Sequence, residues 1–189
     1  MMLLILGLVL FLGVHSISIV APVWRDRVHA RLGEGPWKGL YSLVSIAGFA
    51  LIVVGYGLAR ENPVLIYTPP VWLRHASLLL LVPMFPVLLA AYLPGRIKAT
   101  ARHPMLLAVK LWAAAHLLSN GGAADLLLFG GFLAWAVADR ISMKGRIQRP
   151  LPGAPASPLN DWIAVIGGLA LYALFVFGAH AWLIGVAPV

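Results

Sequence analysis

Six long apolar stretches fill most of this 189-residue chain and leave only short polar segments between them. A helix needs about 20 mostly apolar residues to cross the hydrocarbon core of a bilayer. The stretches lie at about residues 2–21, 40–59, 72–93, 104–120, 123–138 and 162–186. The sequence therefore predicts an all-α membrane protein, a single domain that forms a bundle of about six transmembrane helices.

The composition favours lipid as the surrounding solvent. Hydrophobic residues make up 61% of the chain, and charged residues make up only 11%, about half of their usual share in soluble domains. The absence of cysteine excludes disulfides, thiolate metal sites and cysteine nucleophiles. The net charge of +8 lies mainly in short loops beside apolar stretches, where it attracts anionic head groups. A lipid bilayer is therefore the expected partner, and nucleic acid is not.

The basic residues are concentrated in alternate loops. Eleven of the 14 lysine and arginine residues lie in the first, third and fifth loops: Arg25, Arg27, Arg31, Lys38, Arg96, Lys98, Arg102, Arg140, Lys144, Arg146 and Arg149. Loops rich in lysine and arginine stay on the cytoplasmic side of a membrane. Both termini are therefore predicted to lie on the outer side. Tryptophans at positions 24, 37, 72 and 162 fall near the predicted helix ends, where an aromatic belt is expected.

Prolines and glycines mark special positions in this pattern. Pro83 and Pro86 lie inside the third predicted helix and are expected to kink it, because each removes a backbone hydrogen bond that neighbouring helices must replace. The glycine pairs at 130–131 and 167–168 are expected to allow close helix approach. The segment 150–158 contains four prolines and is predicted to be a cytoplasmic connector.

Two histidines are the main candidates for chemistry. His15 lies in the first predicted helix and His116 in the fourth, and ionisable groups inside hydrocarbon are costly enough to mark functional sites. Histidines from different helices commonly hold a cofactor inside a bundle, and imidazole binds iron well. A b-type haem with both histidines as axial metal ligands is the simplest such site. The alternatives are that each histidine only hydrogen-bonds a neighbouring helix, or that the two relay protons.

Lys110 is the most costly residue in this pattern, since a lysine near the middle of a helix has difficulty reaching the head groups. It is expected to pair with a buried anion, which would be a haem propionate, Asp125 or Asp139. Otherwise it would lose its proton, line a wet cavity or reach the inner head groups. Trp112 shares a helix face with His116 and would either wall a flat cofactor or polyene, or simply pack.

Several short motifs together resemble the NnrU family of bacterial membrane proteins over nearly the whole chain. They are Gly13-Val14-His15-Ser16, Lys38-Gly39-Leu40-Tyr41-Ser42, Arg102-His103-Pro104-Met105, Val109-Lys110-Leu111-Trp112-Ala113, His116, Phe129-Gly130-Gly131-Phe132 and Asp139-Arg140. The resemblance implies a multi-pass protein of the bacterial inner membrane. It further implies a redox or accessory role in nitrite and nitric oxide metabolism, and so in denitrification.

A more distant resemblance is to the 15-cis-zeta-carotene isomerase, a membrane b-type haem enzyme of plants and cyanobacteria. It implies that His15 and His116 are linked to haem, and it also matches Trp112. The alternative function that it implies is haem-dependent cis–trans isomerisation of a polyene. The isomerase has a cysteine as alternate ligand where this chain has Ala113, and a histidine after its second helix where this chain has Arg60. Ligand switching would therefore need another partner here.

The turn at residues 102–104, Arg-His-Pro, is also similar to membrane isoprenylcysteine and phospholipid methyltransferases. Those enzymes carry acidic residues downstream, whereas this chain has none between Asp139 and Asp161. In the haem interpretation, Lys110 neutralises the propionates together with Arg102 or Arg140. His103 is then an interfacial cap or a propionate contact.

A transport or proton-relay protein is the remaining interpretation. It would use Lys110 and three histidines that lie toward the outer side: His75, His116 and His180. The haem interpretation instead requires a redox partner, which the sequence does not identify.

Overall fold

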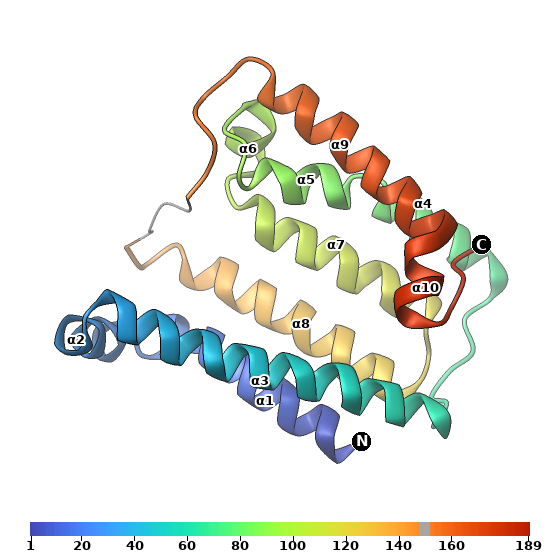
Figure 1. Ribbon diagram of the computed structural model, residues 1–189. Coiled ribbons are helices and arrows are strands. Elements are labelled where there is room, and N and C mark those ends of the chain that lie inside the picture. The colour runs from blue at the N-terminus through green and yellow to red at the C-terminus, as the bar shows by residue number, and fades with distance from the viewer. Residues whose placement is uncertain (148–151) are drawn as a thin grey trace. The chain divides into compact units, whose positions relative to one another are not determined.

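The computed structural model describes residues 1–147 and 152–189. Its helices are α1 (Met2–Val20), α2 (Pro22–Leu32), α3 (Glu34–Glu61), α4 (Val71–Leu81), α5 (Met84–Ala90), α6 (Arg96–Ala101), α7 (Pro104–Ser119), α8 (Ala123–Ser142), α9 (Asn160–Leu174), η1 (Phe175–Ala179) and α10 (His180–Ile184). Figure 1 shows this order along the chain. Arg149 and Pro150, which entered the topology and connector predictions, lie outside the described residues.

The helical class and the membrane helices are confirmed in their coarse form. Four helical segments are long and apolar enough to cross a membrane: Met2–Val20, Glu34–Glu61, Val71–Ala90 and Asn160–Ile184. The outer face of α3 shows the surface that lipid requires, since Leu43, Ile46 and Val53 each expose more than half of their area. The fourth and fifth predicted helices are present as α7 and α8, and Pro104 begins α7 as expected.

The chain divides into two compact units, and each is described by itself. One unit contains Met1–Thr68 and Asn120–Ile147, and therefore α1, α2, α3 and α8. The other contains Pro69–Ser119 and the described part of Gln148–Val189, and therefore α4 to α7, α9, η1 and α10.

In the first unit, glycines bring α1 and α3 into backbone contact. A β-carbon at Gly7 would lie 2.6 Å from the backbone nitrogen of Ile52, and one at Gly48 would lie 2.8 Å from that of Phe11. Figure 1 shows the two helices side by side along most of their length. Membrane helices depend on such close packing, because lipid offers no hydrophobic drive for their association.

The predicted glycine contacts are only partly observed. A β-carbon at Gly131 would lie 3.5 Å from Leu12 of α1, whereas one at Gly130 would meet no atom within 4 Å. In the second unit, a β-carbon at Gly168 would clash with the backbone of Pro86, so α9 and α5 do require glycine there. Within the first unit, Gly130 therefore makes no close helix contact.

The helix α2 occupies a segment that the sequence analysis treated only as a loop. Pro22 occupies its first turn, where a missing backbone N–H costs nothing, and Gly33 ends it with φ +82°. With 11 residues and several charges, α2 has neither the length nor the apolarity of a spanning helix. It is seen end-on in Figure 1, across the adjoining ends of α1 and α3.

In the second unit, the prolines break the third predicted helix as expected. The segment stops at Leu81 and restarts as α5 at Met84, with Val82 donating to the carbonyl of Leu79 in place of that of Leu78. The Tyr172 hydroxyl of α9 donates to the carbonyl of Leu78 at 2.9 Å. A neighbouring helix thus satisfies a backbone group that the break releases.

Side chains at the start of α9 form hydrogen bonds with the backbone at and just before the start of α6. Asp161 accepts hydrogen bonds from the backbone N–H groups of Arg96, at 2.8 Å, and Ile97, at 3.1 Å. The Asn160 side chain donates to the carbonyls of Pro94 and Pro155. Residues 152–157 have no regular structure, as the proline-rich connector predicted.

Candidate functional site

His15 lies among aromatic rings of the first unit. The Phe11 ring of its own helix is at 4.2 Å between centroids, the Tyr41 ring of α3 at 5.2 Å and the Trp135 ring of α8 at 6.0 Å. The Trp135 ring is nearly perpendicular to the imidazole, at 89°. Three helices therefore converge on this half-buried imidazole.

The hydrogen bond of His15 determines which ring nitrogen is left for a ligand. Its Nδ1 lies 2.6 Å from the carbonyl oxygen of Phe11. A carbonyl oxygen only accepts, so Nδ1 carries the proton and Nε2 presents a lone pair. Histidines that bind metals are commonly oriented in this way, through a hydrogen bond from the other ring nitrogen.

Trp135 contributes an unsatisfied donor beside this imidazole. Its indole nitrogen is buried and has no hydrogen-bond partner among the described residues. Buried polar groups are normally paired, so such a donor needs an acceptor other than the described residues of its unit. An oxygen-bearing cofactor next to His15 would supply one.

One turn further along α8 lies the buried carboxylate of Asp139. Its partner is Arg146, whose Nη2 donates to Oδ1 at 2.6 Å, and the hydroxyl of Ser142 lies 3.4 Å from the same oxygen. Asp139 and Arg146 expose only 8% and 17% of their side chains. Arg140, the predicted propionate partner, lies half-buried in the last turn of α8.

His116 repeats the arrangement of His15 in the second unit. Its Nδ1 lies 2.8 Å from the carbonyl oxygen of Trp112, again one turn earlier on the same helix. The Trp112 ring lies 5.4 Å from the imidazole, so the predicted shared face is present. Because a carbonyl oxygen only accepts, this bond makes Nδ1 the nitrogen that carries the proton.

His180 is the second imidazole of this region. Its ring lies 6.3 Å from that of His116, with 26° between the planes. The π-helical turn η1 directly precedes it; wider turns of this kind change the register of a helix and often occur at functional sites. The Nδ1 of His180 lies 2.7 Å from the carbonyl oxygen of Val186.

The remaining predicted site residues lie on or beside α7. Lys110 is half-buried in this helix and makes no hydrogen bond or ion pair with the described residues of its unit. The backbone carbonyl of His103 accepts the first hydrogen bond of α7, at 3.1 Å from the Leu107 nitrogen, and the role of its side chain stays a prediction. Arg102 is exposed and has φ +58°, a strained value for a residue with a side chain.

The carboxylates suggested as partners for Lys110 are already bonded within the first unit. Asp125 accepts from the Tyr56 hydroxyl at 2.5 Å and from the Gly122 nitrogen at 2.9 Å, and Asp139 pairs with Arg146. In the described part of the chain, no group of three or more His, Asp or Glu side chains lies close enough to hold a metal ion.

The comparison with known families agrees with the membrane helices and with the motifs around both histidines. The family model described as NnrU protein matches residues 3–188. The chain belongs to the NnrU family. No curated protein and no solved structure matches it. Membership supports a membrane protein with a role related to nitrite or nitric oxide, and it assigns no reaction.

Within this NnrU protein, His15 and His116 belong to different units, so their pairing on one haem stays a prediction. The sequence analysis did not include Tyr41, Trp135 or Arg146 in the site. The spacing of Trp135 and Asp139, one helical turn apart on α8, was a signal for a shared face. The approach of Tyr41 and Trp135 to His15 depends on helix packing and has no local signal.

Proposed function

We propose that this NnrU protein is a b-type haem protein of the bacterial inner membrane with a redox or accessory role in nitrite and nitric oxide metabolism. In this proposal, His15 and His116 would hold the haem iron. The observation that carries it is their common orientation, because each Nδ1 bonds to the carbonyl one turn earlier on its own apolar helix. In this proposal, Nε2 of each imidazole would be the nitrogen that binds iron.

The surroundings of His15 fit a flat, largely apolar group with polar edges. Phe11, Tyr41 and Trp135 supply aromatic surface, and the unpartnered Trp135 indole supplies a hydrogen-bond donor. As the sequence analysis predicted, Lys110 with Arg102 or Arg140 would neutralise the propionates in this proposal. The haem would supply one-electron exchange between its ferric and ferrous states. The surrounding side chains would set its reduction potential and limit the access of solvent to it.

The ligand assignment is tested by the haem content of single variants. His15→Ala and His116→Ala are each expected to lower the haem-to-protein ratio, because each would remove a ligand of the haem iron. His29→Ala is the control, since this histidine lies on α2, outside the apolar helices. Equal haem content in all three variants would contradict the assignment.

The proposed membrane topology has six spans and places both termini on the outer side. Four of the spans are the long apolar segments, and α7 and α8 are the other two. The helix α7 has 16 residues and so a length of about 24 Å, which is enough to cross the hydrocarbon where the bilayer is locally thinned. The chain has no cysteine, so single cysteines report topology without background. In intact cells, an impermeant maleimide should label Val189→Cys and leave Lys144→Cys unlabelled, and the reverse result would overturn the orientation.

A second candidate function is haem-dependent cis–trans isomerisation of a polyene. The observation that favours it is the aromatic surface around His15, which suits a flat conjugated chain as well as a porphyrin. The test is expression in a carotenoid-producing host that lacks its own isomerase. Conversion of the accumulated cis polyene would support this function. Haem-loaded protein that leaves the polyene unchanged would exclude it.

A further inference from the structure

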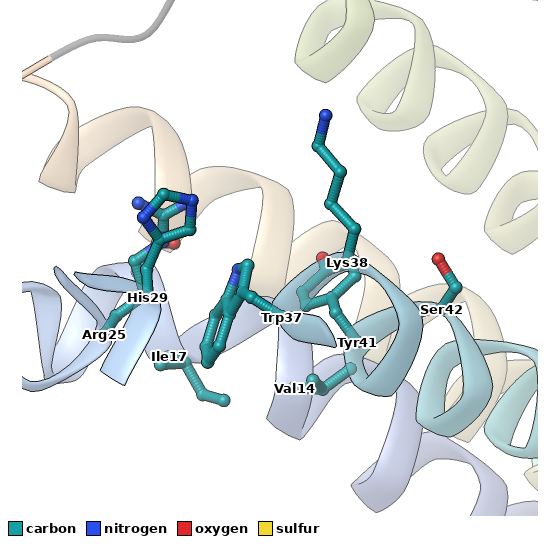
Figure 2. A pocket seen from close by; sticks show the side chains of 9 residues that line it. Val14, Ile17, Arg25, His29, Trp37, Lys38, Tyr41 and Ser42 are labelled. Atoms are coloured by element: carbon teal, nitrogen blue, oxygen red, sulfur yellow. The ribbon is translucent and has the colours of Figure 1, made fainter. Parts of the chain in front are cut away.

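A cavity of about 270 Å³ lies in the first unit, where α1 ends and α3 begins. Basic, imidazole and aromatic side chains line one part of it, and apolar side chains of α1 line another. The lining residues are Val14, Ile17, Ser18, Arg25, His29, Trp37, Lys38, Tyr41 and Ser42. Figure 2 shows that Arg25 and His29 lie on one side of Trp37, and Lys38 and Tyr41 on the other. No carboxylate lines the cavity, so its walls carry net positive charge.

Both cations are available to an anion. Lys38 bonds to Glu34 at 2.5 Å, but the two side chains are 70% and 69% exposed, and an exposed pair of this kind contributes little to stability. Arg25 donates one Nη1 bond to Asp26 at 3.0 Å, which leaves other guanidinium N–H groups for a second acceptor. The Arg25 guanidinium also lies 5.6 Å from the Trp37 ring centroid, which fixes its position through a cation–π contact.

The cavity lies at the end of the apolar helix α1, where a spanning helix would leave the hydrocarbon for the head groups. Val14 and Ile17 belong to the spanning helix α1, whereas Arg25 and His29 belong to α2, which crosses the ends of α1 and α3 (Figure 1). The buried indole of Trp37 and the phenol of Tyr41 are side chains that prefer this interface. An occupant therefore meets apolar walls on one side and positive charge on the other.

The same end of the unit has an excess of positive charge beyond the cavity. The C-terminal turn of α8 contributes Arg140, and the residues after it contribute Lys144, in addition to Arg146, which is paired with Asp139. Figure 1 shows that this end of α8 lies on the same side as α2. Basic pockets between membrane helices on the cytoplasmic side attract anionic lipid head groups.

We infer that this cavity binds the phosphate of an anionic phospholipid head group, with Arg25 and Lys38 as the charged contacts and Trp37 as the apolar wall. The inference is independent of haem binding. An anionic lipid fits better than a soluble phosphate compound. The apolar side chains of Val14 and Ile17 can contact an acyl chain, whereas they form no hydrogen bonds with a hydrated, soluble ligand.

The test is native mass spectrometry of the full chain, released from micelles that contain phosphatidylglycerol or phosphatidylcholine. The wild type should retain phosphatidylglycerol in preference to phosphatidylcholine. Arg25→Gln and Lys38→Gln should each retain about fivefold less phosphatidylglycerol, which is the effect of one basic contact near an anionic lipid. Lys38→Gln keeps the test meaningful if Arg25→Gln disturbs the fold, since the Lys38 side chain is 70% exposed.

The matched control is Arg27→Gln, which removes the same charge from an exposed position of α2 outside the cavity lining. It should retain lipid like the wild type. Equal retention of both lipids, or equal loss in Arg27→Gln and Lys38→Gln, would overturn the inference. Displacement of the lipid by millimolar glycerol 1-phosphate would also overturn it and would identify a soluble phosphate ligand instead. Loss of haem from Lys38→Gln would place propionates in the cavity and exclude the lipid.

Discussion

The phenol hydroxyl of Tyr172 in α9 donates a 2.9 Å hydrogen bond to the carbonyl oxygen of Leu78 in α4. This carbonyl lies just before the helix break at Pro83. In a regular helix it would accept from the backbone N–H of Val82, but here Val82 donates to the carbonyl of Leu79 instead. A carbonyl without a partner inside a membrane protein is costly. The bond therefore joins two helices and stabilises the break.

Tyr172→Phe is expected to lower the free energy of unfolding by about 1 kcal/mol, since it removes one hydrogen bond and no apolar surface. The measurement is unfolding in mixed micelles followed by circular dichroism. Tyr92→Phe is the control, because this residue is 45% exposed. Equal stability of the two variants would show that the Tyr172 bond does not stabilise the break.

Gly48→Ala is expected to separate α1 from α3 and to disturb the His15 environment. The new β-carbon would lie 2.8 Å from the backbone nitrogen of Phe11, and the Phe11 carbonyl is the group that orients His15. Lower thermal stability should therefore accompany lower haem content. Gly57→Ala on the same helix is the matched control, because its β-carbon would meet no atom within 4 Å. Similar behaviour of both variants would argue against glycine-mediated packing.

Arg146→Gln is expected to destabilise the protein by about 3 kcal/mol, because it leaves the buried Asp139 carboxylate without its cation. Thermal unfolding with and without Asp139→Asn in the same chain measures this effect. The second substitution should restore much of the lost stability, since it removes the unpaired charge. Lys38→Gln, which breaks an exposed ion pair, should change stability by less than about 1 kcal/mol. Equal effects of Arg146→Gln and Lys38→Gln would contradict the burial argument.

Much of the fold follows from local features of the sequence. The ends of α1 and α7 lie within a residue of their predicted positions, because the length of an apolar stretch and a first-turn proline are both local signals. The helix α2 was missed because a search for spans of about 20 apolar residues passes over a short, charged helix. The start of α3 at Glu34 instead of residue 40 has the same cause, since its first turns are polar.

The candidate site was less accessible to sequence reasoning. His15, His116 and Trp112 were identified because polar or aromatic residues stand out within apolar helices. The approach of Trp135 and Tyr41 to His15 is set by contacts between helices distant in the sequence. The pairing of Asp139 with Arg146 depends on how the chain turns after α8, and nothing local distinguishes Arg146 from its basic neighbours.

Trp135→Phe tests the unpartnered indole beside His15. The substitution removes no hydrogen bond to the described residues, so the protein should keep its stability and its haem. The midpoint potential of the haem is expected to fall, because removing a hydrogen-bond donor near the haem makes its reduced state less stable. Trp182→Phe is the control, since this ring is 82% exposed. An unchanged potential would show that the indole does not reach the cofactor.

The absorption spectrum of the wild-type protein, purified from haem-replete cells, tests the central claim most directly. Two imidazole ligands on a b-type haem predict a sharp Soret band in the oxidised protein and a distinct α band after reduction with dithionite. Colourless protein from the same cells would contradict the haem assignment for His15 and His116.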